Sequence, residues 1–137
     1  MKHRSRAREV ALQVLYGDDL NPGVEPELLE AFLGVRLKSD ELVDFARSLL
    51  NGVRRNRSEI DALLERIADN WSLTRMAIID RNVLRLGAYE MLYTSTPRRV
   101  VINEAVELAK KFSTAQAPGF VNGILDAIRK NITENTS

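Results

Sequence analysis

Residues 74–94, TRMAIIDRNVLRLGAYEMLYT, are the most apolar stretch of the sequence and indicate how the chain folds. Their apolar residues recur at helical spacing but occupy more than one stripe of the helix. These residues are Met76, Ile79, Val83, Leu84, Leu86, Ala88, Met91 and Leu92. A helix that is apolar on several sides is typical of the centre of a bundle. The stretch therefore predicts a central helix surrounded by other helices.

The sequence before this stretch also has a helical period nearly throughout. Four helices are expected there, beginning near residues 5, 26, 39 and 58. The first of them is expected to end near Gly17. Ser39 or Asp40 is a good N-cap for the third, and Ser58 followed by Asp61 resembles a capping box at the start of the fourth.

Two more helices are expected after the central one. Val100-Val101-Ile102 is predicted to be a short extended segment, since runs of β-branched residues are stiff. Asn103 is then a good N-cap for a helix that ends with Lys110 and Lys111. Pro118 is expected to open the last helix. The sequence thus predicts an all-α fold, a single compact domain of about seven helices.

Composition restricts the class of protein further. The chain has 137 residues, enough for one domain over residues 1–137, and 45% of them are hydrophobic. It has no cysteine, which excludes disulfides, a thiol nucleophile and a zinc–thiolate site. No apolar run approaches eighteen residues, so we expect no membrane contact and a cytoplasmic protein. The net charge is only +1, so any affinity for nucleic acid must come from local patches.

The first sixteen residues combine a cluster of bases with an amphipathic helix. Lys2, Arg4, Arg6 and Arg8 all precede the first acid, Glu9. A positive charge at a helix N-terminus costs about 0.3–1 kcal/mol, because that end already carries roughly half a positive charge. A bound anion would compensate, and phosphate suits both the guanidinium groups and the free backbone N–H groups of the first turn. The alternative is a basic terminus that is merely solvated.

Acidic residues follow this basic end of the chain. Residues 18–44 hold eight acids against two bases, and Asp18-Asp19 is expected to be a solvated pair.

Few side chains of the sequence suit catalysis. His3 is the only histidine, and it lies in the N-terminal segment. The sequence has no phosphate-binding glycine loop, no dinucleotide-binding motif and no metal-ligand spacing. We therefore expect a protein that is not an enzyme and needs no cofactor or metal.

Phe120 and Asn122 begin the last predicted helix and leave two interpretations open. The Phe120 ring could fix this helix to its neighbours, or it could offer a face to an unstacked base. Asn122 could read a base edge or only fix a turn.

Gly52, Gly87 and Gly123 lie inside predicted helices, where glycine costs about 1 kcal/mol relative to alanine. Close contact between helices is therefore expected at all three. Trp71 is expected to be a buried anchor at a junction between helices.

Several stretches of the sequence form one recognisable set. They are Ala7-Arg8-Glu9, Ala11-Leu12-Gln13, Leu15-Tyr16, residues 79–90, Val101 to Lys110, and Phe120 to Asp126. Together they resemble the NusB family of bacterial antitermination factors, and the resemblance covers essentially the whole chain in order.

The resemblance implies a helical fold of two small bundles and a binding function. Members of the family join the ribosomal protein NusE, bind single-stranded boxA RNA with it, and help modify RNA polymerase on ribosomal RNA operons. The implied RNA-binding residues are Lys2, Arg4, Arg6, Arg8, Arg85, Phe120 and Asn122. The implied NusE-binding residues are Tyr16, Asp80 and Arg81. Ser5 departs from the family by interrupting what is often a continuous arginine run.

Two alternatives remain beside this interpretation. The chain could be an RNA-binding module related to domains of ribosomal RNA methyltransferases, although it has no glycine loop for a methyl donor, which favours a stand-alone protein. It could also be a protein-only helical adaptor in which the arginines only increase solubility. A helix-turn-helix DNA-binding protein is disfavoured, because no predicted helix carries several polar residues suited to reading bases.

Overall fold

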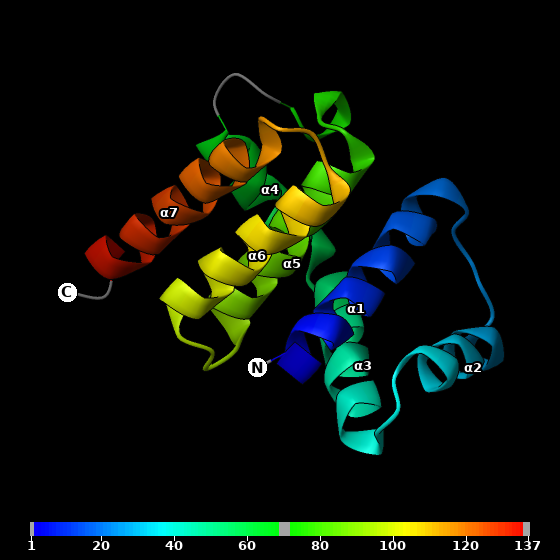
Figure 1. Cartoon of the computed structure of the whole chain (residues 1–137). Coiled ribbons are helices and arrows are strands. Elements are labelled where there is room, and N and C mark those ends of the chain that lie inside the picture. Colours follow the sequence, from blue (N-terminus) through cyan, green and yellow to red (C-terminus); the bar gives the residue numbers. More distant parts are fainter. Residues whose placement is uncertain (1, 69–71, 136–137) are drawn as a thin grey trace.

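The computed structural model describes residues 2–68 and 72–135, and over these residues it consists of helices and the loops that join them (Figure 1). The helices are α1 (Lys2–Leu20), α2 (Pro26–Arg36), α3 (Asp40–Arg55), α4 (Arg57–Ile67), α5 (Ile78–Tyr93), α6 (Arg98–Phe112) and α7 (Ala117–Asn135), with a 3₁₀ turn, η1 (Leu73–Arg75), before α5. The predicted all-α class and number of helices are confirmed. Trp71 lies outside the described residues.

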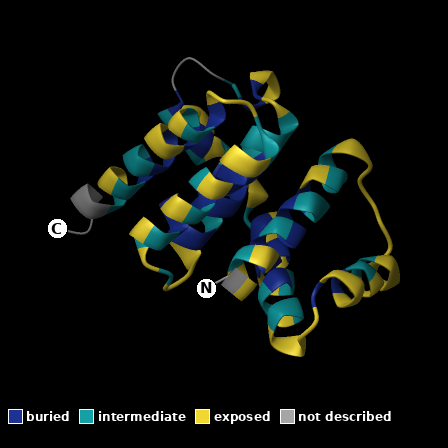
Figure 2. Cartoon of the chain, viewed as in Figure 1, coloured by how far each residue is buried: buried dark blue, intermediate teal, exposed yellow. Residues whose placement is uncertain are grey.

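The helices form two small bundles that meet at α5 (Figure 1). Helices α1, α2 and α3 make one bundle, and α4, α5, α6 and α7 make the other. Helix α5 contacts α1 and α3 as well as α4, α6 and α7. Figure 2 shows the buried residues gathered where these helices face one another, whereas α2 is largely exposed.

Helix α5 is buried on nearly every side, as the sequence predicts. All seven residues from Asn82 to Ala88 are buried, and so are Glu90 and Met91. Two turns of helix with no exposed position can lie only between other helices. Burial here extends to charged side chains, Arg85 and Glu90, which therefore need partners inside the protein.

Local predictions at the helix ends succeeded in part. The Ser39 side chain accepts a hydrogen bond from the backbone N–H of Leu42 at 3.1 Å, which confirms it as the N-cap of α3. The prediction for 100–102 was wrong, because these residues are helical and α6 begins at Arg98. Pro97 precedes the helix, and burial of Val101 and Ile102 outweighs the modest helix penalty of β-branched residues.

Three further boundaries differ from the predictions. Asn103 lies inside α6 and caps nothing, and the N-cap position of α4 is held by Asn56, one residue before Arg57, and not by Ser58. Helix α1 continues past Gly17 to Leu20. The extra turn of α1 carries Asp18 and Asp19, which are bound by arginines of α3, α4 and α5.

Close helix contact explains two of the three helical glycines. A Cβ atom at Gly52 would overlap the ring of Tyr89 in α5, and one at Gly87 would lie 2.8 Å from Leu125 Cδ1 in α7. The prediction for Gly123 was wrong, because nothing lies within 4 Å of a Cβ placed there.

Candidate nucleic-acid and partner interface

Arg4 and Arg6 form an exposed basic head at the N-terminal end of α1. The Arg4 guanidinium lies over the ring of Phe45 in α3, 4.5 Å from the ring centroid. Arg6 is 44% exposed, and its Nη1 lies 3.2 Å from Oε1 of Glu9 on the same helix. The side chain of Lys2 lies outside the described part of the chain. The head thus presents two described guanidinium groups that a phosphate could reach.

Arg8 requires a correction, because it is buried and its guanidinium is already bound. Its Nε and Nη2 donate to the two carboxylate oxygens of Glu90 in α5, at 2.7 and 2.9 Å. Its Nη1 donates to Oε1 of Glu104 in α6 at 3.2 Å. Burial works to lower the pKa of Arg8, but its hydrogen bonds to Glu90 and the nearby carboxylate charges outweigh this and raise it. Arg8 therefore joins three helices and is not free to contact phosphate.

Two further contacts fix the head against α6. The Ser5 hydroxyl lies 2.6 Å from Oε1 of Glu104, so the residue that interrupts the arginine run anchors α1. Lys111 Nζ lies 2.9 and 3.0 Å from the two carboxylate oxygens of Glu9. These contacts bring Lys110 and Lys111, both 59% exposed, to the same side of the molecule as the head. The sequence predicted the two lysines only as helix-terminal charges.

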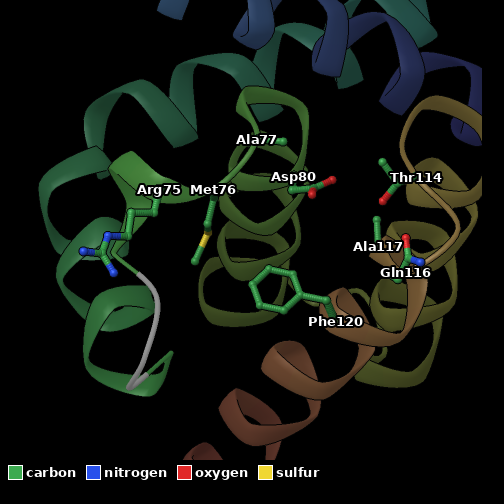
Figure 3. Close-up of a pocket in the computed structure, with 8 residues that line it drawn as sticks. All are labelled: Arg75, Met76, Ala77, Asp80, Thr114, Gln116, Ala117 and Phe120. Carbon is green, nitrogen blue, oxygen red and sulfur yellow. The ribbon is translucent and has the colours of Figure 1, made fainter.

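Phe120 lies in a pocket beyond the C-terminal end of α6 (Figure 3). The pocket measures about 220 Å³. It is lined by Arg75, Met76, Ala77, Asp80, Thr114, Gln116, Ala117 and Phe120. The Phe120 ring is half-buried and points toward Met76 and Asp80 across the pocket. Asn122, two residues after Phe120 in α7, is exposed.

Asp80 is only partly exposed, although it was expected on the partner surface. Its Oδ1 accepts a hydrogen bond of 2.5 Å from the Ser113 hydroxyl, which joins the first turn of α5 to the end of α6. Because Asp80 also lines the Phe120 pocket, the structure brings one residue from each predicted binding set into a single pocket.

Arg85 also requires a correction, because it is buried between helices. Its Nε and Nη2 donate to the carboxylate of Asp61 in α4 at 2.8 and 3.0 Å, and its Nη1 donates to Asp19 at 3.0 Å. Burial works to lower the pKa of Arg85, but these two carboxylates outweigh it and raise the pKa. The guanidinium is thus fully engaged within the protein, and RNA cannot reach it in this conformation.

Asp19 is the centre of this second ionic cluster, so the prediction that it is solvated was wrong. Its side chain is 4% exposed, and it accepts from Asn82 Nδ2 at 2.8 Å, Arg81 Nε at 3.0 Å and Arg57 Nη2 at 2.9 Å. Burial works to raise the pKa of Asp19, but the hydrogen bonds from Asn82 and Arg81 and the charges of Arg85 and Arg81 outweigh it and lower the pKa. Arg81 was expected at the partner surface, but its guanidinium donates hydrogen bonds to Asp19 and to the backbone carbonyl of Leu73.

Tyr16 borders a second hollow, of about 450 Å³, between α1 and α5. The side chain is 38% exposed. The other lining residues are Leu12, Gln13, Ala77, Ile78, Ile79 and Phe112. Oε1 of Gln13 is buried without a hydrogen-bond partner among the described residues. Ala77 lines both this hollow and the Phe120 pocket, so the two share a wall.

The described residues hold neither a candidate metal site nor a helix that could cross a membrane. Residues 2–68 and 72–135 contain no cluster of three side chains that could hold a metal ion. Over the same ranges, none of the helices combines the length and apolar character that crossing a membrane requires.

The fold and these contacts define the class of protein. It is a small all-α domain of two bundles that carries exposed cations and an aromatic pocket along one edge. A family model described as the NusB family matches residues 5–130. The chain therefore belongs to the NusB family.

Individual relatives agree with this assignment. The chain is 46% identical over 133 residues to the transcription antitermination protein NusB of Myxococcus xanthus, covering 93% of this chain and 95% of the relative. It resembles the solved structure of T. maritima NusB with a TM-score of 0.82 and 37% identity, over 93% and 90% of the two chains. It also resembles a chain from the crystal structure of antitermination factors NusB and NusE in complex with dsRNA, with a TM-score of 0.86 and 33% identity over 96% and 98%.

Proposed function

We propose that this chain is a transcription antitermination factor that binds boxA RNA together with the ribosomal protein NusE and helps modify RNA polymerase on ribosomal RNA operons. It acts as a binding protein and not as an enzyme, in the cytoplasm, and its 137 residues form one functional domain. The observation that carries the RNA part is the exposed edge that runs from Arg4 and Arg6, along α6, to Phe120. Membership of the NusB family supports the rest.

The proposed RNA track follows helix α6. The helix touches the head at Glu104, carries Lys110 and Lys111 near its end, and leads to Thr114 at the edge of the Phe120 pocket. The seven steps along the helix from Glu104 to Lys111 span roughly 10 Å at about 1.5 Å per residue. Lys2 and Asn122 stay in the proposed RNA set, whereas Arg8 and Arg85 leave it.

The proposed NusE surface is the hollow beside Tyr16, together with Asp80. Tyrosine at the rim of an apolar hollow suits a protein partner, because its ring supplies contact area and its hydroxyl stays free to bond. Asp80 adds a negative charge suited to a basic ribosomal protein. Arg81 has a supporting role, because its hydrogen bonds hold Asp19 of α1 and the Leu73 carbonyl of η1 in place.

A binding titration tests the proposal as a whole. Fluorescence anisotropy would compare a boxA single strand, a scrambled strand and an RNA duplex, each with and without NusE, over a range of salt concentrations. We expect the boxA strand to bind tightest, more tightly with NusE, and less tightly as salt rises. Binding that ignores salt and sequence would favour the protein-only adaptor, and preference for the duplex would overturn the single-strand part.

The substitution Phe120→Ala tests the aromatic pocket. If the ring stacks on a base, RNA binding should lose about 1–3 kcal/mol with little change in melting. If the ring is mainly a core residue, about 3–5 kcal/mol of unfolding free energy should be lost instead. Phe32→Ala is the matched control, because Phe32 is also half-buried but lies in α2, which takes no part in either proposed surface.

The substitution Asp80→Lys tests the partner surface. Like charges should then oppose NusE and weaken its association, at a cost of about 2–5 kcal/mol. RNA binding by the chain alone should change little or rise slightly, because Asp80 lines the Phe120 pocket and the lysine adds a positive charge there. Titration calorimetry with NusE measures this, and a melting curve shows that the variant is folded. Unchanged NusE affinity in a folded variant would place the partner surface elsewhere.

A further inference from the structure

A third hollow opens on the other side of the basic head, between the N-terminal ends of α1 and α3. It measures about 570 Å³ and is lined by His3, Arg4, Lys38, Ser39, Glu41 and Leu42. Its cationic side chains come from two segments that are more than thirty residues apart in the sequence. The sequence shows Lys38 only as one of two bases within an acidic segment.

The two permanent cations of this hollow, Arg4 and Lys38, have no carboxylate partner among the described residues, unlike the arginines of the ion pairs. Arg47, Arg54 and Arg57 each lie within 3 Å of a carboxylate oxygen. Among the described residues, neither Arg4 nor Lys38 has a carboxylate within 4 Å, and both are exposed. Their charges are therefore available to an anion from outside.

The other groups of the hollow set its chemistry. The Ser39 hydroxyl oxygen accepts from Leu42 N, and its O–H can still donate a hydrogen bond to an anion. The His3 imidazole is exposed and can donate a hydrogen bond to an anion. Glu41 is the one acid among the lining residues and opposes an anion. Two permanent positive charges against one negative charge leave the hollow favourable to phosphate.

We propose that this hollow binds a phosphate of the RNA backbone outside the boxA element, so that the protein holds a longer strand than the element itself; this rests on the proposed function. Arg4 faces α3 through Phe45, whereas the adjacent Ser5 faces α6 through Glu104. A strand that passes from Phe120 along α6 to the head therefore reaches this hollow next. Phosphate contacts of this kind add affinity without adding sequence preference.

Two RNA lengths test the proposal. Fluorescence anisotropy would compare a strand that ends at boxA with strands extended by a short run of uridines at either the 5′ or the 3′ end. We expect one extension to raise affinity about three- to tenfold and to steepen the log–log salt slope by about 0.7, as one added phosphate contact on a single strand should. Lys38→Gln should remove this gain and leave the affinity for the short strand unchanged.

Two further variants separate this site from general electrostatics. Arg36→Gln removes the same charge two residues away, where the guanidinium lies 4.7 Å from the centroid of the Phe32 ring, and should keep the gain. Glu41→Gln should increase the gain, because it removes the opposing charge. Melting curves establish that each variant is folded.

The outcomes distinguish this inference from the function it rests on. If the short strand binds but neither extension adds affinity, the third hollow binds no RNA, and the proposed function stands. Equal losses for Lys38→Gln and Arg36→Gln would likewise overturn it, as general electrostatics would then explain the gain. If neither strand binds, with or without NusE, both proposals fall together.

Discussion

The two ends of α1 carry opposite charges, and each end meets the opposite charge on α5. At the N-terminal end, Arg8 binds Glu90 near the end of α5. At the C-terminal end, Asp19 binds Arg81 and Arg85 nearer the start of α5. The two helices therefore run antiparallel. Reversing α1 would place like charges together in a buried contact, so these pairs specify one orientation.

The two ends of α1 differ in whether their charged side chains are already bound within the protein. At the C-terminal end, Asp18 is bound by Arg54, and Asp19 accepts from donors on α4 and α5. At the N-terminal end, only Arg8 is fully bound, and Arg4 has no carboxylate partner among the described residues. The comparison teaches that charge of one kind can hold the fold together at one position and remain free for a ligand one helical turn away.

The largest expected effect comes from removing the buried arginine. Arg8→Ala leaves Glu90, whose side chain is 2% exposed, as an unpaired buried charge. We expect a loss of about 3–5 kcal/mol in unfolding free energy, measured by urea denaturation. Arg6→Ala, two residues away and exposed, is the control and should cost less than about 1 kcal/mol. Similar losses for the two variants would contradict the distinction between buried and exposed arginines.

Asp19→Asn tests the opposite end and should cost on the order of 3 kcal/mol at neutral pH, because the carboxylate accepts from several charged donors. The folded-state pKa of Asp19 is lowered below its unfolded value of about 3.9, so its stabilisation is complete above roughly pH 5. This stabilisation is lost as the pH falls through the folded-state pKa. Denaturation at several pH values should therefore show wild type and variant converging in acid. A difference that stays constant with pH would argue against an ionised Asp19.

Removing both arginines of the head should affect RNA binding rather than folding. Arg4→Gln with Arg6→Gln should cost about 2 kcal/mol of RNA affinity, at about 1 kcal/mol for each lost contact. The log–log salt slope should fall by about 1.4, and boxA and scrambled strands should weaken about equally. Salt titrations by anisotropy measure both quantities. A loss confined to boxA would mean that these side chains read bases.

The smallest effect is expected at the exposed pair beside the acidic end. Arg54 donates to both carboxylate oxygens of Asp18 at 2.8 Å, but its side chain is 37% exposed. Arg54→Gln should therefore cost only about 0–1 kcal/mol by urea denaturation, since solvent screens such pairs. A loss as large as that of Asp19→Asn would show that exposure does not determine how much each acid's ion pair contributes to the free energy of unfolding.

The fold could be predicted from the sequence more fully than the site could. The pattern of α5 depends on residues close together in the chain, and its apolar positions on several sides already require neighbours. The state of Arg8 depends on Glu90, which is 82 residues away, and that of Asp19 on arginines more than 30 residues away. Helical spacing does place Arg4 and Arg8 on one face, but only the packing of α5 shows which of them is buried.

The contact between Arg4 and Phe45 has a consequence for conformational entropy. A free arginine or lysine side chain loses about 0.5–1.5 kcal/mol of rotamer freedom when a ligand immobilises it. Because the Arg4 guanidinium already lies over the ring of Phe45, much of that freedom is lost when the protein folds. An anion that meets Arg4 therefore binds a group that is already ordered, whereas Lys38 across the same hollow still has its freedom to lose.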